Sequence, residues 1–167
     1  LYAAHTNLDS TPDGMSWRVA HMLGLESVEV MQPTNAEGAG FGVVGELAEV
    51  EKSEDFMRRV MECFDVKALR HSDIVKSEIR KVAICTGAGG SLIDDARASG
   101  ADIYLTADLR YNDFMRHENA IILADMGHFE SEYCAIQILF DILSKKIPIF
   151  AVRKSVCSRN PVNYMVR

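Results

Sequence analysis

The sequence has few cysteines and no closely spaced pair of them. It contains no CxxC motif and no short cysteine framework of the kind that crosslinks small secreted domains. No apolar run approaches the roughly 18 residues that indicate a transmembrane helix, and no basic-then-apolar leader stands at the start. We therefore expect a soluble, cytoplasmic protein that makes no contact with a membrane. The four cysteines, expected to be reduced core thiols, are Cys63, Cys85, Cys134 and Cys157.

Positive charge is also scarce. Lys and Arg number 18 against 24 Asp and Glu, which gives a net charge of −6 and a pI near 5.3. This balance argues against a nucleic-acid partner bound through phosphate neutralisation. The 48% hydrophobic and 25% charged residues are average for globular proteins, so disordered and collagen-like classes are excluded. With 167 residues and no linker, we expect a single domain over 1–167.

Short apolar runs alternate with amphipathic segments along the chain. This order predicts an α/β fold of layered sheets with helices on both faces, and parallel strand pairs joined by right-handed crossovers. A polar stretch at 67–77 is where we place a possible break between two subdomains. The chain starts without an initiator Met, and we expect the native protein to have residues before Leu1, so that the domain is N-terminally incomplete. The expected strands are 1–5, 27–31, 42–50, 81–85, 102–106, 120–124 and 147–152, and the expected helices are 16–23, 91–99, 111–117, 128–144 and one that begins at Ser53.

The most specific local motif is GHFESE, residues 127–132, at the expected start of the last long helix. His128 and Glu132 are four residues apart, so on a helix their side chains share one face. An imidazole and a carboxylate at that spacing can bind one metal ion together. The alternative is that the pair only solvates and caps the helix, which is the commoner role of such a pair. The expected strand before this motif ends near Asp125. His128 and Glu132 should therefore lie at a carboxyl edge of the sheet, whichever role they have.

A second candidate lies near the start of the chain, in the motif HTNLD. If residues 1–5 form a strand, His5 and Asp9 leave the sheet at the edge expected for His128 and Glu132. Asp9 has two carboxylate oxygens that can bridge two metals, and His5 can serve as a ligand, a proton shuttle or a group that orients a ligand. Equally, Asp9 can cap the turn through Ser10 and Thr11.

Two further segments carry polar groups at strand ends. The glycine-rich turn from Gly87 to Ser91 can present backbone N–H groups to a phosphate, although it lacks the Lys-Ser/Thr ending of a P-loop and is explained equally well as a tight turn. Asp108 follows the expected strand at 102–106, where its carboxylate can take part in a site or cap a helix, and we favour the helix N-cap.

Taken together, these motifs resemble the GTP cyclohydrolase I type 2 family, also called the Ngg-interacting-factor-three-like family. AHTNLD at 4–9, the 40–47 segment, the GAGGS turn, 102–108 and GHFESE occur in that family's order over nearly the whole chain. The resemblance implies two intimately packed subdomains, a dinuclear metal site and a ring-shaped homo-oligomer, commonly a hexamer. By motif it makes Asp9, His128 and Glu132 metal ligands, with Asp9 bridging, and places His5 beside the site.

The chain departs from the family pattern in three places. Two more ligands usually come from an adjacent His-His pair upstream of this motif, and no His-His occurs here. Ala107 stands where a Gly is usual, and Asn112 where a His is usual. Three protein ligands suffice for one open, hydrolytic metal but do not fill two coordination spheres. The expected cofactors are therefore divalent Zn, Fe, Mn or Co, two per subunit in a complete family site and one or none in this form.

The resemblance also implies a function, metal-dependent hydrolysis of a purine nucleotide such as GTP or a related small molecule. His5 is the candidate catalytic residue for proton transfer, because an imidazole exchanges protons near neutral pH. Arg110 and the Gly87–Ser91 turn are candidates to contact the triphosphate. The alternative function is a non-catalytic, metal-binding oligomeric scaffold or a regulator of another protein.

Overall fold

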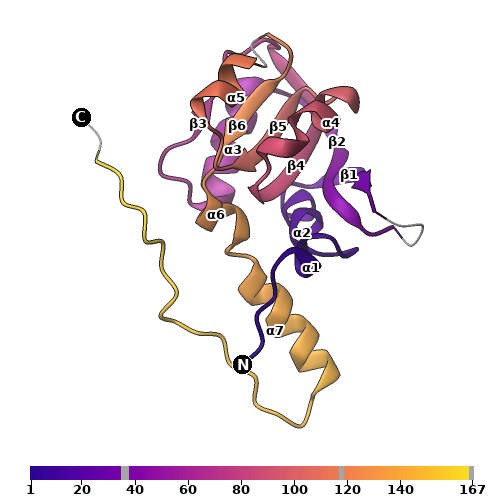
Figure 1. Ribbon diagram of the computed structural model, residues 1–167, viewed down its shortest axis with the longest axis vertical. Helices are drawn as coiled ribbons and strands as arrows, with labels where there is room; N and C mark the ends of the chain where they lie inside the picture. The colour runs from indigo at the N-terminus through magenta and orange to yellow at the C-terminus, as the bar shows by residue number, and fades with distance from the viewer. Residues whose placement is uncertain (35–37, 117–118, 166–167) are drawn as a thin grey trace.

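The computed structural model describes residues 1–34, 38–116 and 119–165. Its centre is a six-stranded sheet in the order β1-β2-β4-β5-β6-β3 (Figure 1). Mixed strand directions and helices on both faces make this an α/β fold, as the sequence predicts. The strands are β1 (Leu25–Pro33), β2 (Gly40–Lys52), β3 (Arg70–His71), β4 (Glu78–Ala88), β5 (Ile103–Ala107) and β6 (Ile122–Asp125).

The prediction of parallel pairing holds for only half of the sheet. β4, β5 and β6 are parallel neighbours, whereas β1 with β2, β2 with β4 and β3 with β6 are antiparallel. β1 and β2 are joined by a short connection, which permits only an antiparallel pair. The helical crossovers lie between β4, β5 and β6, so the carboxyl ends of these three strands meet at one edge.

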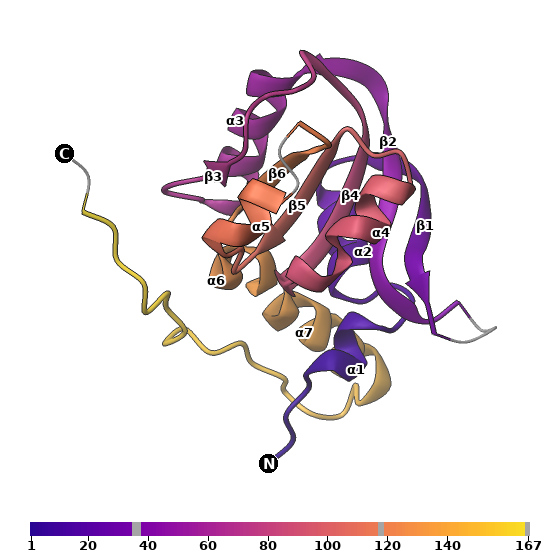
Figure 2. The same ribbon diagram turned by 45° about the horizontal axis from the view of Figure 1, so that its top comes forward.

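Helices cover both faces of the sheet (Figure 2). α2 and α3 lie on one face, and α4 and α5 on the other. The helices are α1 (Thr6–Asp9), α2 (Met15–Met22), α3 (Ser53–Phe64), α4 (Ile93–Ala98), α5 (Tyr111–Arg116), α6 (His128–Glu132) and α7 (Ala135–Lys146), with a 3₁₀ turn, η1 (Gly90–Leu92), before α4. The expected helix at 111–117 is confirmed to residue 116, and residue 117 is outside the described residues.

The centres of the parallel strands are apolar because both of their faces are covered. Ile103 and Leu105 of β5 belong to the core beneath α2 and α3, whereas Tyr104 between them belongs to the core beneath α4. Every residue of β5 and of β6 is buried. Continuous apolar runs of this kind are typical of strands between two helical layers.

Two expected strands are wrong. Residues 1–4 form no strand, and Leu1 and Tyr2 are exposed. Residues 147–152 are also irregular, held by local backbone bonds such as the one from the Phe150 N–H to the Ile147 carbonyl at 3.1 Å. Both segments are apolar enough to suggest strands, but neither lies beside an edge of the sheet where it can pair.

The expected helix over 128–144 is two helices. α6 ends at Glu132, and α7 begins at Ala135. Between them the chain tightens, since the Gln137 N–H bonds the Cys134 carbonyl three residues back at 3.0 Å. The continuous apolar periodicity of the sequence does not reveal this break.

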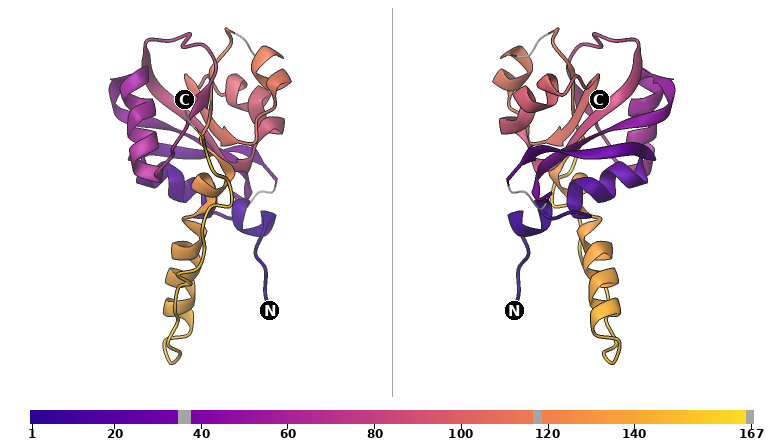
Figure 3. Two further views of the ribbon diagram at one scale, coloured as in Figure 1. Left: turned by 90° about the vertical axis from the view of Figure 1, so that its left-hand side faces the viewer. Right: turned by 90° about the vertical axis from the view of Figure 1, so that its right-hand side faces the viewer.

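α7 extends away from the body of the molecule, and the segment after it runs back alongside (Figure 3). Ile138 is the single buried residue that α7 contributes. Within the described ranges, no helix has both the length and the apolar character needed to cross a bilayer.

The cysteines are less buried than expected. All four are free; Cys85 and Cys134 are partly buried, whereas Cys63 and Cys157 are exposed. The interpretation as core thiols is therefore wrong for the last two.

Candidate metal centre

His128 stands at the start of α6, three residues beyond the end of β6. β6 runs parallel to β5, with Asp125 opposite Thr106, so the loops after both strands reach the same edge of the sheet. Gly127 turns the chain into α6 with a φ of 90°, a left-handed value that favours glycine. The sequence-based placement of His128 and Glu132 at a carboxyl edge is confirmed.

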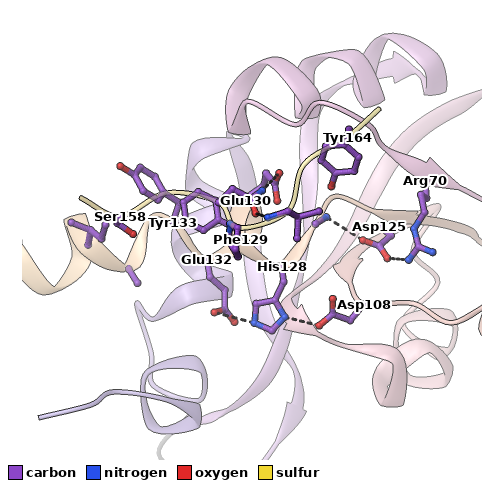
Figure 4. Close-up of a pocket in the computed structure, with 16 residues that line it drawn as sticks. Arg70, Asp108, Asp125, His128, Phe129, Glu130, Glu132, Tyr133, Ser158 and Tyr164 are labelled. Atoms are coloured by element: carbon purple, nitrogen blue, oxygen red, sulfur yellow. Dashed lines mark hydrogen bonds and ion pairs between the residues drawn. The ribbon is translucent and has the colours of Figure 1, made fainter. Parts of the chain in front are cut away.

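The imidazole of His128 lies between two carboxylates (Figure 4). Its Nδ1 is 2.6 Å from Oδ2 of Asp108, and its Nε2 is 3.3 Å from Oε2 of Glu132. The hydrogen bond to Asp108 raises the pKa of His128, and the charges of Glu132 and Asp108 add to this, against the effect of burial. The two carboxylates therefore stabilise the protonated imidazole when no cation is bound.

Asp108 contacts His128, and its interpretation from the sequence as a helix N-cap is wrong. It is not the N-cap of the following helix, because α5 begins three residues later, at Tyr111. Its backbone is left-handed, with a φ of 54°, and its carboxylate faces His128. A carboxylate on the second ring nitrogen of a metal-binding histidine fixes the tautomer and the ring orientation. The available signal was an acidic residue directly after a fully buried strand.

Asp9 reaches the same region from α1. Burial and the negative charge of Glu132 raise the pKa of the Asp9 carboxyl, whereas the charges of His5 and His128 lower it. Asp9 therefore lies within electrostatic range of all three other predicted residues. The convergence of Asp9 on the His128–Glu132 pair stays a prediction, and a short helix carries Asp9 in place of the expected strand end.

Glycine at position 87 leaves space for Glu132. Gly87 has a φ of 65°, and a Cβ there would lie 2.3 Å from Oε1 of Glu132 and 3.5 Å from Cε1 of His128. The Gly87 N–H donates to Oγ of Ser131 at 3.0 Å, and the Ser131 hydroxyl donates to the His128 carbonyl at 2.9 Å. The turn after β4 is thus fastened to α6, and the N–H of Gly87 is used by Ser131 and not by an anion.

A buried carboxylate fixes the two loops that carry Asp108 and His128. Asp125 accepts hydrogen bonds from the backbone N–H groups of Leu109, at 2.9 Å, and Gly127, at 3.1 Å. Arg70 forms an ion pair with the same carboxylate and donates to the Leu109 carbonyl at 2.7 Å. Because Leu109 and Gly127 are the chain neighbours of Asp108 and His128, this network sets the spacing of that pair.

Cys85 lies close to the same carboxylates but is not a thiolate. Burial raises its pKa to about 11, and the charges of Asp9 and Glu132 contribute in the same direction. The thiol therefore stays protonated at neutral pH, the form that neither attacks substrates nor binds metals well.

The side chains of the site have donor atoms that suit a divalent cation, but they are not arranged around a common point as metal ligands are. Within the described part of the chain, no three His, Cys, Asp or Glu side chains form a ready-made metal cluster. Both ring nitrogens of His128 contact carboxylates instead. One imidazole and two nearby carboxylates are nonetheless a common ligand set for first-row divalent metals, and the crowded negative charge at Asp9 and Glu132 is of the kind that a cation neutralises.

A cavity of about 610 Å³ adjoins the pair on the side of α6. Its inner wall is α6 with the start of α7, and its outer wall is the C-terminal segment, residues 158–164 (Figure 4). This wall could not be predicted from the sequence, because that stretch is irregular and has no periodic pattern.

The fold and the site together define an α/β protein with an imidazole–carboxylate cluster at the carboxyl edge of its parallel strands. The model of the Duf34/NIF3 (NGG1p interacting factor 3) family matches residues 1–161, and the chain belongs to that family.

Known proteins similar to the chain bear this out. It is 31% identical over 150 residues to the GTP cyclohydrolase 1 type 2 homolog of Clostridium acetobutylicum, covering 88% of this chain and 54% of that protein. It is 35% identical over 140 residues to the homolog of the same name from Streptomyces coelicolor, covering 80% and 49%. The chain thus spans about half the length of the curated relatives it matches.

Solved structures show the same fold. A Bacillus cereus protein related to NIF3 superposes with a TM-score of 0.88 at 21% identity, over 98% of this chain and 73% of that one. Staphylococcus aureus protein SA1388 gives a TM-score of 0.87 at 22% identity, over 98% and 68%.

Proposed function

We propose that the chain binds a divalent metal through Asp9, His128 and Glu132 and acts as a metal-dependent hydrolase on a purine nucleotide or a related small molecule. The observation that carries the proposal is the His128 imidazole held between Asp108 and Glu132, with Asp9 in electrostatic range. The relatives named GTP cyclohydrolase 1 type 2 homolog support the reaction class.

The residues have separate parts in this proposal. Asp108 holds the Nδ1 proton of His128, so that Nε2 is the atom that gives up its proton and binds the cation. Glu132 and Asp9 would supply the two carboxylate ligands of the cation. A bound divalent cation provides Lewis acidity, which makes hydroxide available near neutral pH. His5, whose charge acts on Asp9, would exchange a proton with substrate or water.

The identity and number of metals follow from the donor set. One imidazole and two carboxylates suit Zn, Fe, Mn or Co. Three ligands complete one open site, and this chain contains no His-His pair for a second. We therefore propose one metal per chain for the residues present here.

The experiment is a turnover assay with Zn-, Mn- or Fe-loaded protein and GTP, following opening of the imidazole ring and release of formate. The proposal predicts metal-dependent turnover that Glu132→Gln abolishes while circular dichroism is unchanged. Metal binding without turnover of GTP, ATP or their nucleosides would overturn the hydrolase function and favour the non-catalytic scaffold.

Self-association is part of the proposal, because apolar side chains are exposed on α7 and the segment after it. Ile142, Leu143, Ile149 and Phe150 are among them, and apolar side chains grouped on one projecting part of the chain favour an interface. We propose a homo-oligomer, a hexamer by family resemblance, in which a second copy covers this surface. Sedimentation of the full chain tests it: a larger assembly is expected, and a monomer at micromolar concentration contradicts it.

A further inference from the structure

Strand β4 bulges where it passes the proposed metal ligands. The pairing of β4 with β5 shifts there, so that residues 85–87 stand opposite a single residue of β5, Thr106. A bulge of this kind interrupts the backbone ladder and re-aims the neighbouring residues, and bulges are common beside active sites. Thr86 and Gly87 are buried. The backbone groups of the bulge therefore need partners other than the neighbouring strand.

Two hydroxyl groups of β5 provide such partners. Tyr104 and Thr106 are two residues apart on the strand, so their side chains point to the same face of the sheet, the one that α4 covers. The Tyr104 hydroxyl donates to the Gly89 carbonyl at 2.9 Å, and the Thr106 hydroxyl donates to the Gly87 carbonyl at 3.2 Å. Both side chains are 0% exposed, and burial raises the pKa of Tyr104 well above its usual range. The phenol therefore keeps its proton and remains a donor at neutral pH.

Glycine at position 89 admits both donors. A Cβ there would lie 2.2 Å from the hydroxyl oxygen of Thr106 and 2.5 Å from that of Tyr104. A larger residue would push the turn away from the two hydroxyl groups. The glycine-rich composition of this turn is thus explained by its contacts with β5.

Two further hydroxyl groups hold the same segment from α2 and α6. Oγ of Ser16 accepts a hydrogen bond from the Thr86 N–H at 3.2 Å, and Oγ of Ser131 accepts one from the Gly87 N–H at 3.0 Å. Side chains of three separate elements therefore fix the backbone of residues 86–89.

This fixed segment lies directly behind the proposed metal ligands. A Cβ at Gly87 would lie 2.3 Å from Oε1 of Glu132 and 3.5 Å from Cε1 of His128. A metal site needs ligand distances within about 0.2 Å of their ideal values. Even a small displacement of Gly87 should therefore change how well Glu132 and His128 hold a cation.

We propose that Tyr104 and Thr106 are positioning residues of the metal centre, whose hydroxyl groups hold the bulge of β4 against Glu132 and His128. Neither residue is a ligand in this proposal, and both act through Gly87. The inference rests on the proposed function for the identity of the ligands. It goes beyond that function because it makes two residues inside the core determinants of metal affinity.

The test is competition for Co²⁺ between the full chain and a chromogenic chelator, with the visible absorption of bound Co²⁺ as a second readout of ligand geometry. Thr106→Val keeps the size of the side chain and removes the hydroxyl, and we expect it to weaken binding about tenfold and to change the spectrum. Tyr104→Phe should have an effect of the same kind. Thr106→Ser keeps the hydroxyl and should bind nearly as tightly as the wild type. Wild-type affinity in Thr106→Val, or equal losses in Thr106→Val and Thr106→Ser, would overturn the inference.

A buried hydroxyl at the other end of β4 gives the matched control. Ser53 is 1% exposed, and its hydroxyl donates to the Lys76 carbonyl at 2.5 Å, beside the start of the strand. Ser53→Ala should lower stability in urea and leave Co²⁺ affinity unchanged. If it weakens Co²⁺ binding as much as Thr106→Val does, general destabilisation accounts for the effect and the positioning role is refuted.

A measurement without metal separates this inference from the proposed function. The Cε1–H group of His128 lies against Gly87, so its NMR chemical shift in EDTA at fixed pH reports the position of the bulge. Thr106→Val should move this resonance and Ser53→Ala should not, and an unmoved resonance in Thr106→Val contradicts the inference. If Thr106→Val is unfolded by circular dichroism, Tyr104→Phe decides by the same measurements. A wild type that binds no Co²⁺ refutes the proposed function alone, whereas tight Co²⁺ binding that both hydroxyl deletions leave intact refutes this inference alone.

Discussion

Nδ1 of His128 and Oδ2 of Asp108 lie 2.6 Å apart, although the residues are 20 positions apart in the chain. Such a contact fixes which ring nitrogen of the histidine faces the proposed cation. It joins the loop after β5 to the first turn of α6. The imidazole is therefore held in place at the carboxyl edge of the sheet.

Removing this partner should weaken metal binding without unfolding the protein. We expect Asp108→Ala to lower the affinity for Zn²⁺ or Co²⁺ about ten- to a hundredfold, because the ring loses its orientation and basicity. Competition with a chromogenic chelator measures the affinity. Asp55→Ala, an exposed carboxylate of α3, is the control, and an equal loss there would contradict the role of Asp108.

Asp125 should contribute to stability through the two backbone groups that it satisfies. Asp125→Ala leaves the N–H groups of Leu109 and Gly127 without an acceptor, and we expect it to cost about 2–3 kcal/mol of unfolding free energy. Arg70 is more than half exposed, so Arg70→Met should cost about 1 kcal/mol or less. Urea denaturation compares them. Similar losses in both variants would show that the ion pair, and not the backbone contacts, carries the effect.

Alanine substitutions at two glycines with left-handed backbones can distinguish the cost of backbone strain from an effect on the site. Gly87 and Gly100 have φ values of 65° and 77°, but a Cβ meets Glu132 at 2.3 Å only at Gly87, and nothing within 4 Å at Gly100. Gly100→Ala should therefore cost only the left-handed strain, about 1–2 kcal/mol, and leave metal affinity intact. Gly87→Ala should cost more stability and also displace Glu132. Chelator competition that finds equal metal affinity in both variants would contradict this.

Stability should fall at acid pH partly through Asp102. Burial raises the pKa of this carboxyl, but hydrogen bonds from Lys76 and from the backbone N–H groups of Lys81 and Arg80 outweigh it, and the pKa is lowered. A lowered folded-state pKa gives stability that is present above the unfolded-state value, about 3.9, and is lost as pH falls through the folded-state value.

Replacing Asp102 should remove this pH dependence. Asp102→Asn should be less stable than the wild type at pH 7, by about 1–3 kcal/mol, and the difference should shrink below about pH 4. Urea denaturation between pH 2.5 and 7 measures it. A difference that stays constant across that range would show that the charge of Asp102 is not the cause.

The sequence was sufficient for the covered strands and for half of the site. Buried strands such as β5 can be predicted from the sequence because both of their faces are apolar. His128 and Glu132 can be predicted to lie side by side because helical spacing puts them on one face. The strands predicted from apolar runs at 1–5 and 147–152 do not form, because a strand also needs the edge of a sheet with which to pair. A possible break between two subdomains near residues 67–77 stays a prediction.

What the sequence did not reveal depends on contacts between distant segments. Asp108 meets His128 only because β5 and β6 are parallel neighbours, and residues 158–164 form a cavity wall without any regular structure. Asp9 lies on the short helix α1, where the sequence analysis expected a turn after a strand at 1–5. Each relation is set by tertiary packing, which local patterns do not encode.

The most direct test of the metal centre is anomalous diffraction from crystals of the full chain grown with Zn²⁺ or Mn²⁺. The account predicts a peak with ligand atoms of Asp9, His128 and Glu132 within about 2.0–2.3 Å. Absence of density there at saturating metal, or a peak bound only by other residues, would contradict it.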